Sequence, residues 1–138
     1  MPATTDMAYA SALLSDPAQT YRRIDVAGRT AGADAPALVQ LLYEELVAAL
    51  RAAGHAAERG QYAVRGERVT RATAILFALE AGLDFGAGKE LSTTLARLYA
   101  GARATILSAA IGDDPRPFRD TADTLEDIAA AWATARAA

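Results

Sequence analysis

The stretch over residues 34–59, DAPALVQLLYEELVAALRAAGHAAER, limits the possible folds of this chain more than any other part of it. On a helix that turns about 100° per residue, its apolar residues gather on one side. The two-residue alternation of a strand is absent. The stretch predicts one long helix that begins near Pro36, capped by Asp34, and ends at Gly60. Its core-facing seam is Leu38, Leu42, Leu46, Leu50, Ala53 and Ala57.

This helix carries more apolar surface than a single seam requires. Leu41 widens the apolar arc on one side of the seam, and Tyr43 and Val47 widen it on the other. Deep burial explains such a surplus more often than a binding partner does. The helix is nevertheless a candidate to offer two surfaces, one to its own core and one to another molecule.

The rest of the chain predicts three more amphipathic helices, over residues 61–84, 89–111 and 117–136. Breaks lie at Gly60, over residues 85–88 and over residues 113–117, where Gly, Asp and Pro interrupt the helical pattern. The three seams are Tyr62, Val69, Ala72, Leu76, Leu79 and Leu83; Leu91, Leu95, Leu98, Ala102, Ile106 and Ala109; and Phe118, Leu125, Ile128, Ala129 and Trp132. Short connections between four helices predict an all-α fold, an antiparallel four-helix bundle over residues 35–138.

Residues 1–34 do not show the pattern of a stable element. A short apolar patch over residues 7–14 is long enough for two helical turns, which makes a short N-terminal helix an alternative to a flexible tail. Further on, Tyr21, Ile24 and Val26 are isolated apolar residues. A segment of this length would not fold alone. Two interpretations stay open: a disordered tail, or a tail that lies in a groove of the bundle and caps it.

The side of the third predicted helix opposite its seam lacks the charges that normally cover a solvent-facing side. Ala96, Ala100 and Ala104 recur there at four-residue intervals, with Leu107 nearby. Small residues at this spacing let another backbone approach closely. A high alanine content alone would also produce such a side, but a covered face is the favoured interpretation. In the preceding helix, Phe77 points away from its own seam.

Composition and charge exclude several classes of protein. The net charge is −3, with no basic run and no cluster of aromatic residues, so no nucleic-acid partner is expected. Cysteine is absent, which fits a reducing compartment. The first residues carry Asp6 and no Lys or Arg before the apolar patch, unlike a signal peptide. No window approaches the roughly 20 apolar residues of a membrane span. We therefore expect a soluble cytoplasmic protein without membrane insertion.

Catalytic and metal-binding patterns are not found in the sequence. His55, the single histidine, suits a helical phosphotransfer domain, but Glu58 follows where a phosphoryl group would favour a cation. Carboxylate di-metal bundles need histidines from two helices. A P-loop and a Gly-rich dinucleotide motif are also missing. We expect no enzyme, no metal and no cofactor, and phosphotransfer through His55 is kept as the alternative function.

Several motifs in order resemble the FliS family, the flagellar secretion chaperones of flagellin. QTYRRIDV and then APALVQLLYEEL are similar to the start of that family. The Gly60 break, ATAILFALEAGLD, GAGKEL, LARLY, an Asp-Pro break and Trp132 follow at matching intervals, so the likeness covers residues 21–132. The chain departs from the family pattern at Ala35, at Ala100-Gly101-Ala102 and at Ala110-Ile111.

The resemblance implies a cytoplasmic chaperone that binds the disordered C-terminal segment of flagellin, prevents its premature polymerisation and supports its delivery to the flagellar type III export apparatus. Components of the export gate are further possible partners, and a monomer or weak homo-oligomer is expected. A four-helix bundle that only self-associates is a second alternative to the chaperone function, beside phosphotransfer through His55. The candidate partner-binding residues are Tyr21, Ile24, Val26, Leu41, Tyr43, Val47, Ile75, Phe77, Ala96, Ala100, Ala104 and Leu107.

Overall fold

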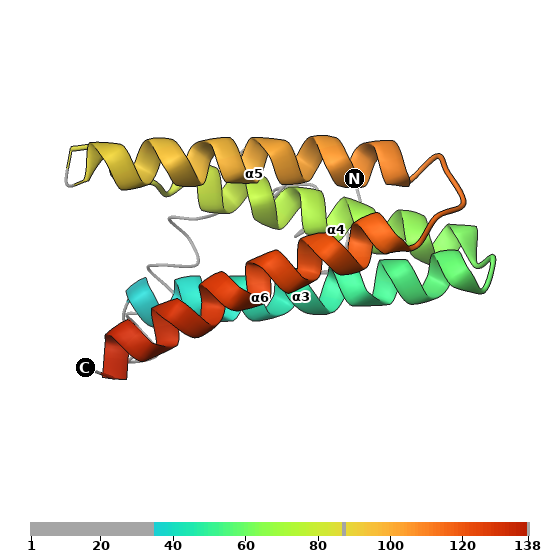
Figure 1. The fold of residues 1–138 in the computed structure, drawn as a ribbon, viewed down its shortest axis with the longest axis horizontal. Coiled ribbons are helices and arrows are strands. Elements are labelled where there is room, and N and C mark those ends of the chain that lie inside the picture. The colour runs from blue at the N-terminus through green and yellow to red at the C-terminus, as the bar shows by residue number, and fades with distance from the viewer. Residues whose placement is uncertain (1–34, 87, 138) are drawn as a thin grey trace, which may run out of the picture.

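The computed structural model describes residues 35–86 and 88–137. Its helices are α3 (Ala35–Glu58), α4 (Tyr62–Ala81), α5 (Lys89–Ala109) and α6 (Arg116–Ala137), and no strand occurs in this part of the chain (Figure 1). The all-α prediction is confirmed, with helix ends that differ from the expected ones by up to three residues. The expectations for residues 1–34, including Tyr21, Ile24, Val26 and the Asp34 cap, lie outside the described residues.

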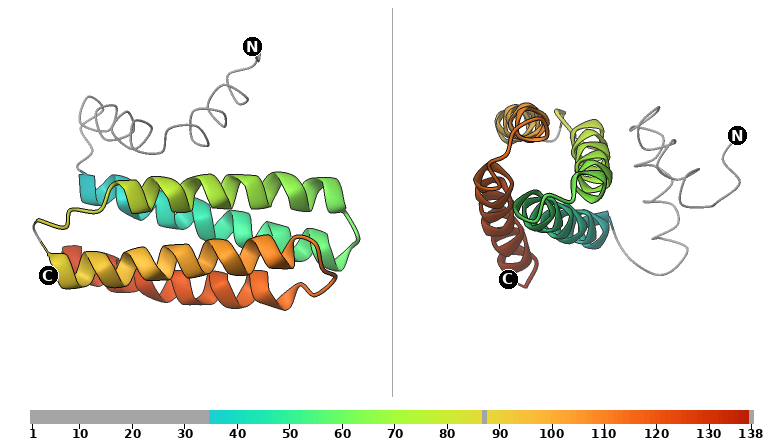
Figure 2. Two further views of the ribbon diagram at one scale, coloured as in Figure 1. Left: turned by 90° about the horizontal axis from the view of Figure 1, so that it is seen from above. Right: turned by 90° about the vertical axis from the view of Figure 1, so that its right-hand side faces the viewer.

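The four helices form an antiparallel bundle in which successive helices are neighbours (Figures 1 and 2). α3 packs closely against α4 on one side and α6 on the other, whereas α5 contacts its two neighbours more sparsely, α6 least of all. α5 lies diagonally across the bundle from α3 in the end-on view of Figure 2. α3 is therefore the central element of the core, and α5 is the helix with most surface to spare.

The predicted seams form the core with two exceptions. All six predicted seam residues of α3 are buried, and all of them except Leu38 belong to a core cluster with buried residues of the other helices, among them Leu76, Ile106 and Leu125. Tyr62 is 54% exposed because it opens α4, where its hydroxyl lies 3.5 Å from Asp113 rather than in the core. Leu91 is 59% exposed because it lies in the first turn of α5, where α6 is not packed closely against it.

Tyr43, Val47 and Ile75 belong to the core, so in this structure they are not part of an exposed partner-binding surface. α3 needs an apolar arc wider than one seam because it has neighbours on both sides, and this arc buries Tyr43 and Val47. Ile75 is buried on α4 in the same cluster. The hydroxyl of Tyr43 forms a buried hydrogen bond with that of Tyr99 on α5. Burial raises the pKa of Tyr43, an effect that hydrogen bonding with Tyr99 and Trp132 opposes.

Gly60 ends α3 as the sequence predicts. Its φ of 70° lies in the left-handed region that favours glycine. The Gln61 N–H donates to the carbonyl of Ala56 at 2.8 Å, and the Gly60 N–H donates to that of Ala57 at 3.2 Å. This pair of bonds is a Schellman motif, which satisfies carbonyls that the helix end would otherwise leave free.

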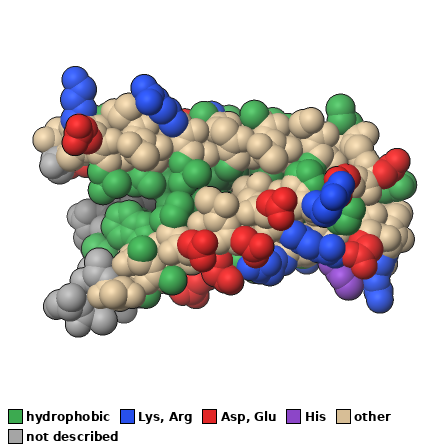
Figure 3. Space-filling view, in the orientation of Figure 1, with side chains coloured by type: hydrophobic (Ala, Val, Ile, Leu, Met, Phe, Trp, Pro, Cys, Tyr) green, Lys and Arg blue, Asp and Glu red, His purple; other side chains and the backbone are tan. Residues whose placement is uncertain are grey.

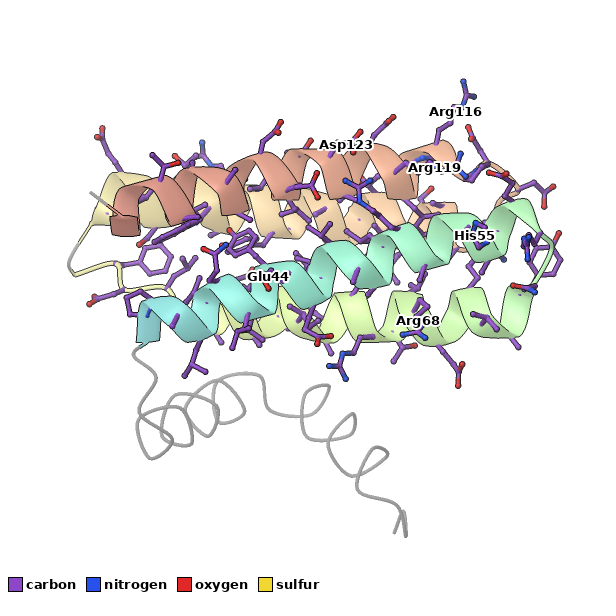
Figure 4. All side chains as sticks on the ribbon, turned by 90° about the horizontal axis from the view of Figure 1, so that it is seen from below. Glu44, His55, Arg68, Arg116, Arg119 and Asp123 are labelled. Atoms are coloured by element: carbon purple, nitrogen blue, oxygen red, sulfur yellow. The ribbon has the colours of Figure 1, made fainter. Side chains whose placement is uncertain are left out.

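Exposed ion pairs join the helices on the outside of the bundle. Arg51 of α3 reaches Asp123 and Glu126 of α6, each at 3.1 Å. Arg119 of α6 pairs with Glu58 of α3, and Figure 4 shows Arg119 and Asp123 along α6. Hydrogen bonding to Arg119 lowers the pKa of Glu58. Such exposed pairs each contribute little to stability, so packing rather than charge holds α6 against α3.

Candidate functional site

The outer face of α5 is exposed and carries almost no charge. We define this outer face as Ala100, Ala104 and Leu107, which are all exposed, Leu107 to 52%. Ala96 lies beside it and is half-buried. The predicted bare side of this helix therefore faces solvent and is not part of the core. An apolar helix side that no other part of the bundle covers is a candidate for contact with a partner.

On the α4 side, the outer face is bordered by an aromatic ring held under an arginine. The guanidinium of Arg103 lies 4.2 Å from the centroid of the Phe77 ring, and it also donates to both carboxylate oxygens of Glu80, at 2.8 and 3.1 Å. Both charged side chains are half-buried, so this ion pair is screened less than the exposed ones. The stacked guanidinium holds Phe77 at the surface while Glu80 neutralises the charge.

On the α6 side, the outer face leads into a groove, which we call the α5–α6 groove. Its volume is about 290 Å³, and its lining residues are Arg97, Leu98, Gly101, Ala102, Thr105, Thr121, Thr124 and Leu125. Threonine and small residues make the groove wide enough for another chain to approach. Arg97 is the one charged residue among those that line it.

Apolar side chains continue this groove toward the start of α5. Figure 3 shows hydrophobic side chains gathered between the first half of α5 and the last half of α6. Leu91 in the first turn of α5 is exposed, and Leu98 of α5 and Ile128 and Trp132 of α6 are half-buried. The sparse packing of α5 against α6 thus leaves an apolar strip beside the outer face.

The described candidate residues named from the sequence lie in three places, one of which is the core, where Tyr43, Val47 and Ile75 are buried. Ala96, Ala100, Ala104, Leu107 and Phe77 lie together on α5 and its α4 border. The other described candidate at the surface is Leu41 on α3, diagonally across the bundle from α5.

None of the partner-binding candidates named from the sequence lies in the α5–α6 groove or in the apolar strip. The one available signal was Arg97, which interrupts an otherwise uncharged helix side. The contribution of Thr121 and Thr124 depends on how α6 is turned toward α5, which a helical wheel of one segment does not show.

His55 is the residue that the sequence offers for phosphotransfer. His55 is exposed on α3, and Figure 4 shows it near the end of that helix. Among residues 35–86 and 88–137 no three His, Asp or Glu side chains come together as a metal site. None of the helices in these ranges has the length and apolar content needed to cross a membrane. The site with the most distinctive surface is thus the outer face of α5 with its two borders.

Comparison with known proteins identifies the family of this chain. The family described as "Flagellar protein FliS" matches residues 17–138. The chain belongs to the FliS family. A relative from Salmonella typhimurium, named flagellar secretion chaperone FliS, is 29% identical over 115 residues, which cover 83% of this chain and 85% of the relative. A FliS relative of the same name from Vibrio cholerae is 26% identical over 114 residues, or 83% and 84% of the two chains.

Proposed function

We propose that this protein is a flagellar secretion chaperone that binds the C-terminal segment of flagellin. Binding keeps that segment from polymerising too early and supports its delivery to the flagellar type III export apparatus, with export-gate components as further partners. The supporting observation is the outer face of α5, an exposed and nearly uncharged helix side in a family whose curated relatives are named secretion chaperones. The role is binding in the cytoplasm, without catalysis.

The physical basis is helix-in-groove recognition. An amphipathic client helix lays its apolar side along α5, where Ala100 and Ala104 permit close approach. Phe77 on one border and the apolar strip on the other supply larger side chains for the client to cover. A client that orders on binding loses several kcal/mol of the gross interaction energy, so a long contact with modest net affinity is expected. Modest affinity suits a client that must be released.

Calorimetric titration of the full chain tests this proposal. The C-terminal segment of flagellin is titrated against the protein at several temperatures, beside an N-terminal flagellin segment of equal length. The C-terminal segment should bind more tightly and with a negative heat-capacity change, because apolar surface is buried. Binding of the two segments with equal affinity, or of neither, would show that the proposed client is wrong.

A further inference from the structure

Arg97 differs from the other arginines on its side of the bundle. Arg103 pairs with Glu80, Arg116 with Asp114 and Arg119 with Glu58. Among the α5 and α6 arginines whose side chains the structure describes, Arg97 alone has no carboxylate partner. α6 offers it none within the groove, because the α6 residues that line the groove are Thr121, Thr124 and Leu125.

The surroundings of Arg97 favour a partner from outside. It lies at the edge of a groove whose other lining residues are uncharged, so a carboxylate placed there would meet one cation and no competing acid. A client helix that covers the groove would exclude water from the pair, and this reduced screening would strengthen the attraction relative to that at an open surface. The guanidinium also presents a planar fork of N–H donors that matches both oxygens of a carboxylate.

Space for that partner lies one turn further along α5. A Cβ atom built on Gly101 would meet nothing within 4 Å, so the backbone at this position is open to the groove. Gly101 and Ala104 therefore let a second helix approach α5 beside Arg97. The close approach would hold the client's side chains near the Arg97 guanidinium.

We propose that Arg97 binds a side-chain carboxylate, Asp or Glu, of the client helix that lies along the α5–α6 groove. This inference rests on the proposed function, and it names the feature that fixes the register of the client on an otherwise apolar surface. Apolar contacts alone allow a helix to slide by one turn, whereas a single ion pair in an uncharged groove specifies one alignment. The client must therefore carry an acidic residue on the margin of its apolar side.

Charge reversal tests the assignment. Arg97→Glu should weaken binding of the flagellin C-terminal segment about tenfold or more, because two like charges would meet in the groove. Arg97→Gln should weaken it less and should reduce the dependence of the affinity on salt. Arg68→Glu is the matched control, because Arg68 is exposed on α4 and outside the groove lining, and it makes the same change of net charge. The control should bind like the parent.

Substitutions in the client complete the test. Each Asp and Glu of the segment is replaced by Lys in turn, and one of these variants should restore the affinity of Arg97→Glu while weakening binding to the parent protein. If no client variant does so, or if amidation of the client's chain end abolishes the effect of the Arg97 substitutions, then the proposal that Arg97 binds a side-chain carboxylate is wrong. Thermal melts of the Arg97 variants should match that of the parent, since this exposed side chain has no partner to lose.

The two proposals fail in different ways. If the parent protein does not bind the flagellin segment at all, the proposed function is wrong. If the parent binds and Ala104→Arg abolishes binding, but Arg97→Glu binds like the parent, then the client covers α5 without using Arg97, and the inference about the carboxylate is overturned.

Discussion

Tyr43 and Tyr99 join α3 and α5 across the diagonal of the bundle by a hydrogen bond between their hydroxyl groups. Their rings lie 6.3 Å apart, centroid to centroid, at 55° to each other, and both are buried. α5 is otherwise the least closely packed helix, so this polar contact in an apolar interior fixes how α5 is turned. The orientation of the outer face of α5 depends on it.

Replacing Tyr43 with Phe should destabilise the bundle. The substitution removes a buried hydrogen bond while keeping the ring, so the free energy of unfolding should fall by about 1 kcal/mol. Urea denaturation measures this change. Tyr62→Phe is the control, because the Tyr62 hydroxyl is exposed and its distance of 3.5 Å from the acceptor is long for a hydrogen bond. Its effect should stay within about 0.5 kcal/mol. Equal effects of the two substitutions would contradict the role of the buried pair.

Alkaline pH should destabilise the parent more than Tyr43→Phe. The pKa of Tyr43 is raised in the folded protein by burial, so the folded state holds its proton more tightly than the unfolded state does. The stability linked to this group is fully present below the unfolded pKa of about 10 and is lost as pH rises from there through the folded pKa. Melting temperatures measured from pH 8 upward, at about half-unit steps, should fall more steeply for the parent. Parallel curves would show that Tyr43 titrates normally.

Gly60→Ala should destabilise the protein by about 1 kcal/mol, because an alanine at a φ of 70° is strained and weakens the Schellman motif. Gly66→Ala is a matched control within α4, where the added methyl group meets nothing within 4 Å. That control should stabilise the helix by roughly 0.5–1 kcal/mol, since alanine is the better helix former. Both changes are read from thermal or urea melts, and a loss of stability in both variants would contradict this account of Gly60.

His55→Ala should leave flagellin binding unchanged, because His55 is exposed on α3, away from the outer face of α5. Titration of the variant with the flagellin C-terminal segment checks this expectation. Incubation of the parent with acetyl phosphate, followed by mass spectrometry, checks the alternative. Stoichiometric phosphorylation of His55 would favour the phosphotransfer function over the chaperone.

Much of the fold could be predicted from the sequence because the α3 seam and the Gly60 stop are local signals. Residues Leu42, Leu46 and Leu50 repeat at helical spacing, and their burial follows from that repeat alone. The sequence alone could not show whether Tyr43 is buried or binds a partner, because the helical wheel of one segment does not show how many neighbouring helices it has. Its contact with Tyr99 joins residues 56 positions apart in the chain, and nothing local marks it.

From the sequence, the outer face of α5 could be predicted as part of the candidate site, but the groove beside it could not. Ala100 and Ala104 stand out in the sequence because charges are missing around them, and the structure leaves them exposed. The groove beside them forms because α6 contacts α5 sparsely, and the same sparse contact exposes Leu91, which had been expected in the core. Spacing between two helices is a property of the whole bundle and not of either segment.

The central claim, that a client helix covers the outer face of α5, is tested most directly by Ala100→Arg and Ala104→Arg. Both positions are exposed, so melts of the two variants should stay within about 0.5 kcal/mol of the parent. Ala130→Arg, at an exposed position on α6, is the matched control. Isothermal titration with the flagellin C-terminal segment should show binding weakened about tenfold or more in the two α5 variants, because a long cation would enter an apolar contact, and unchanged binding in the control. Parent-like affinity in both α5 variants would contradict the claim and place the client elsewhere.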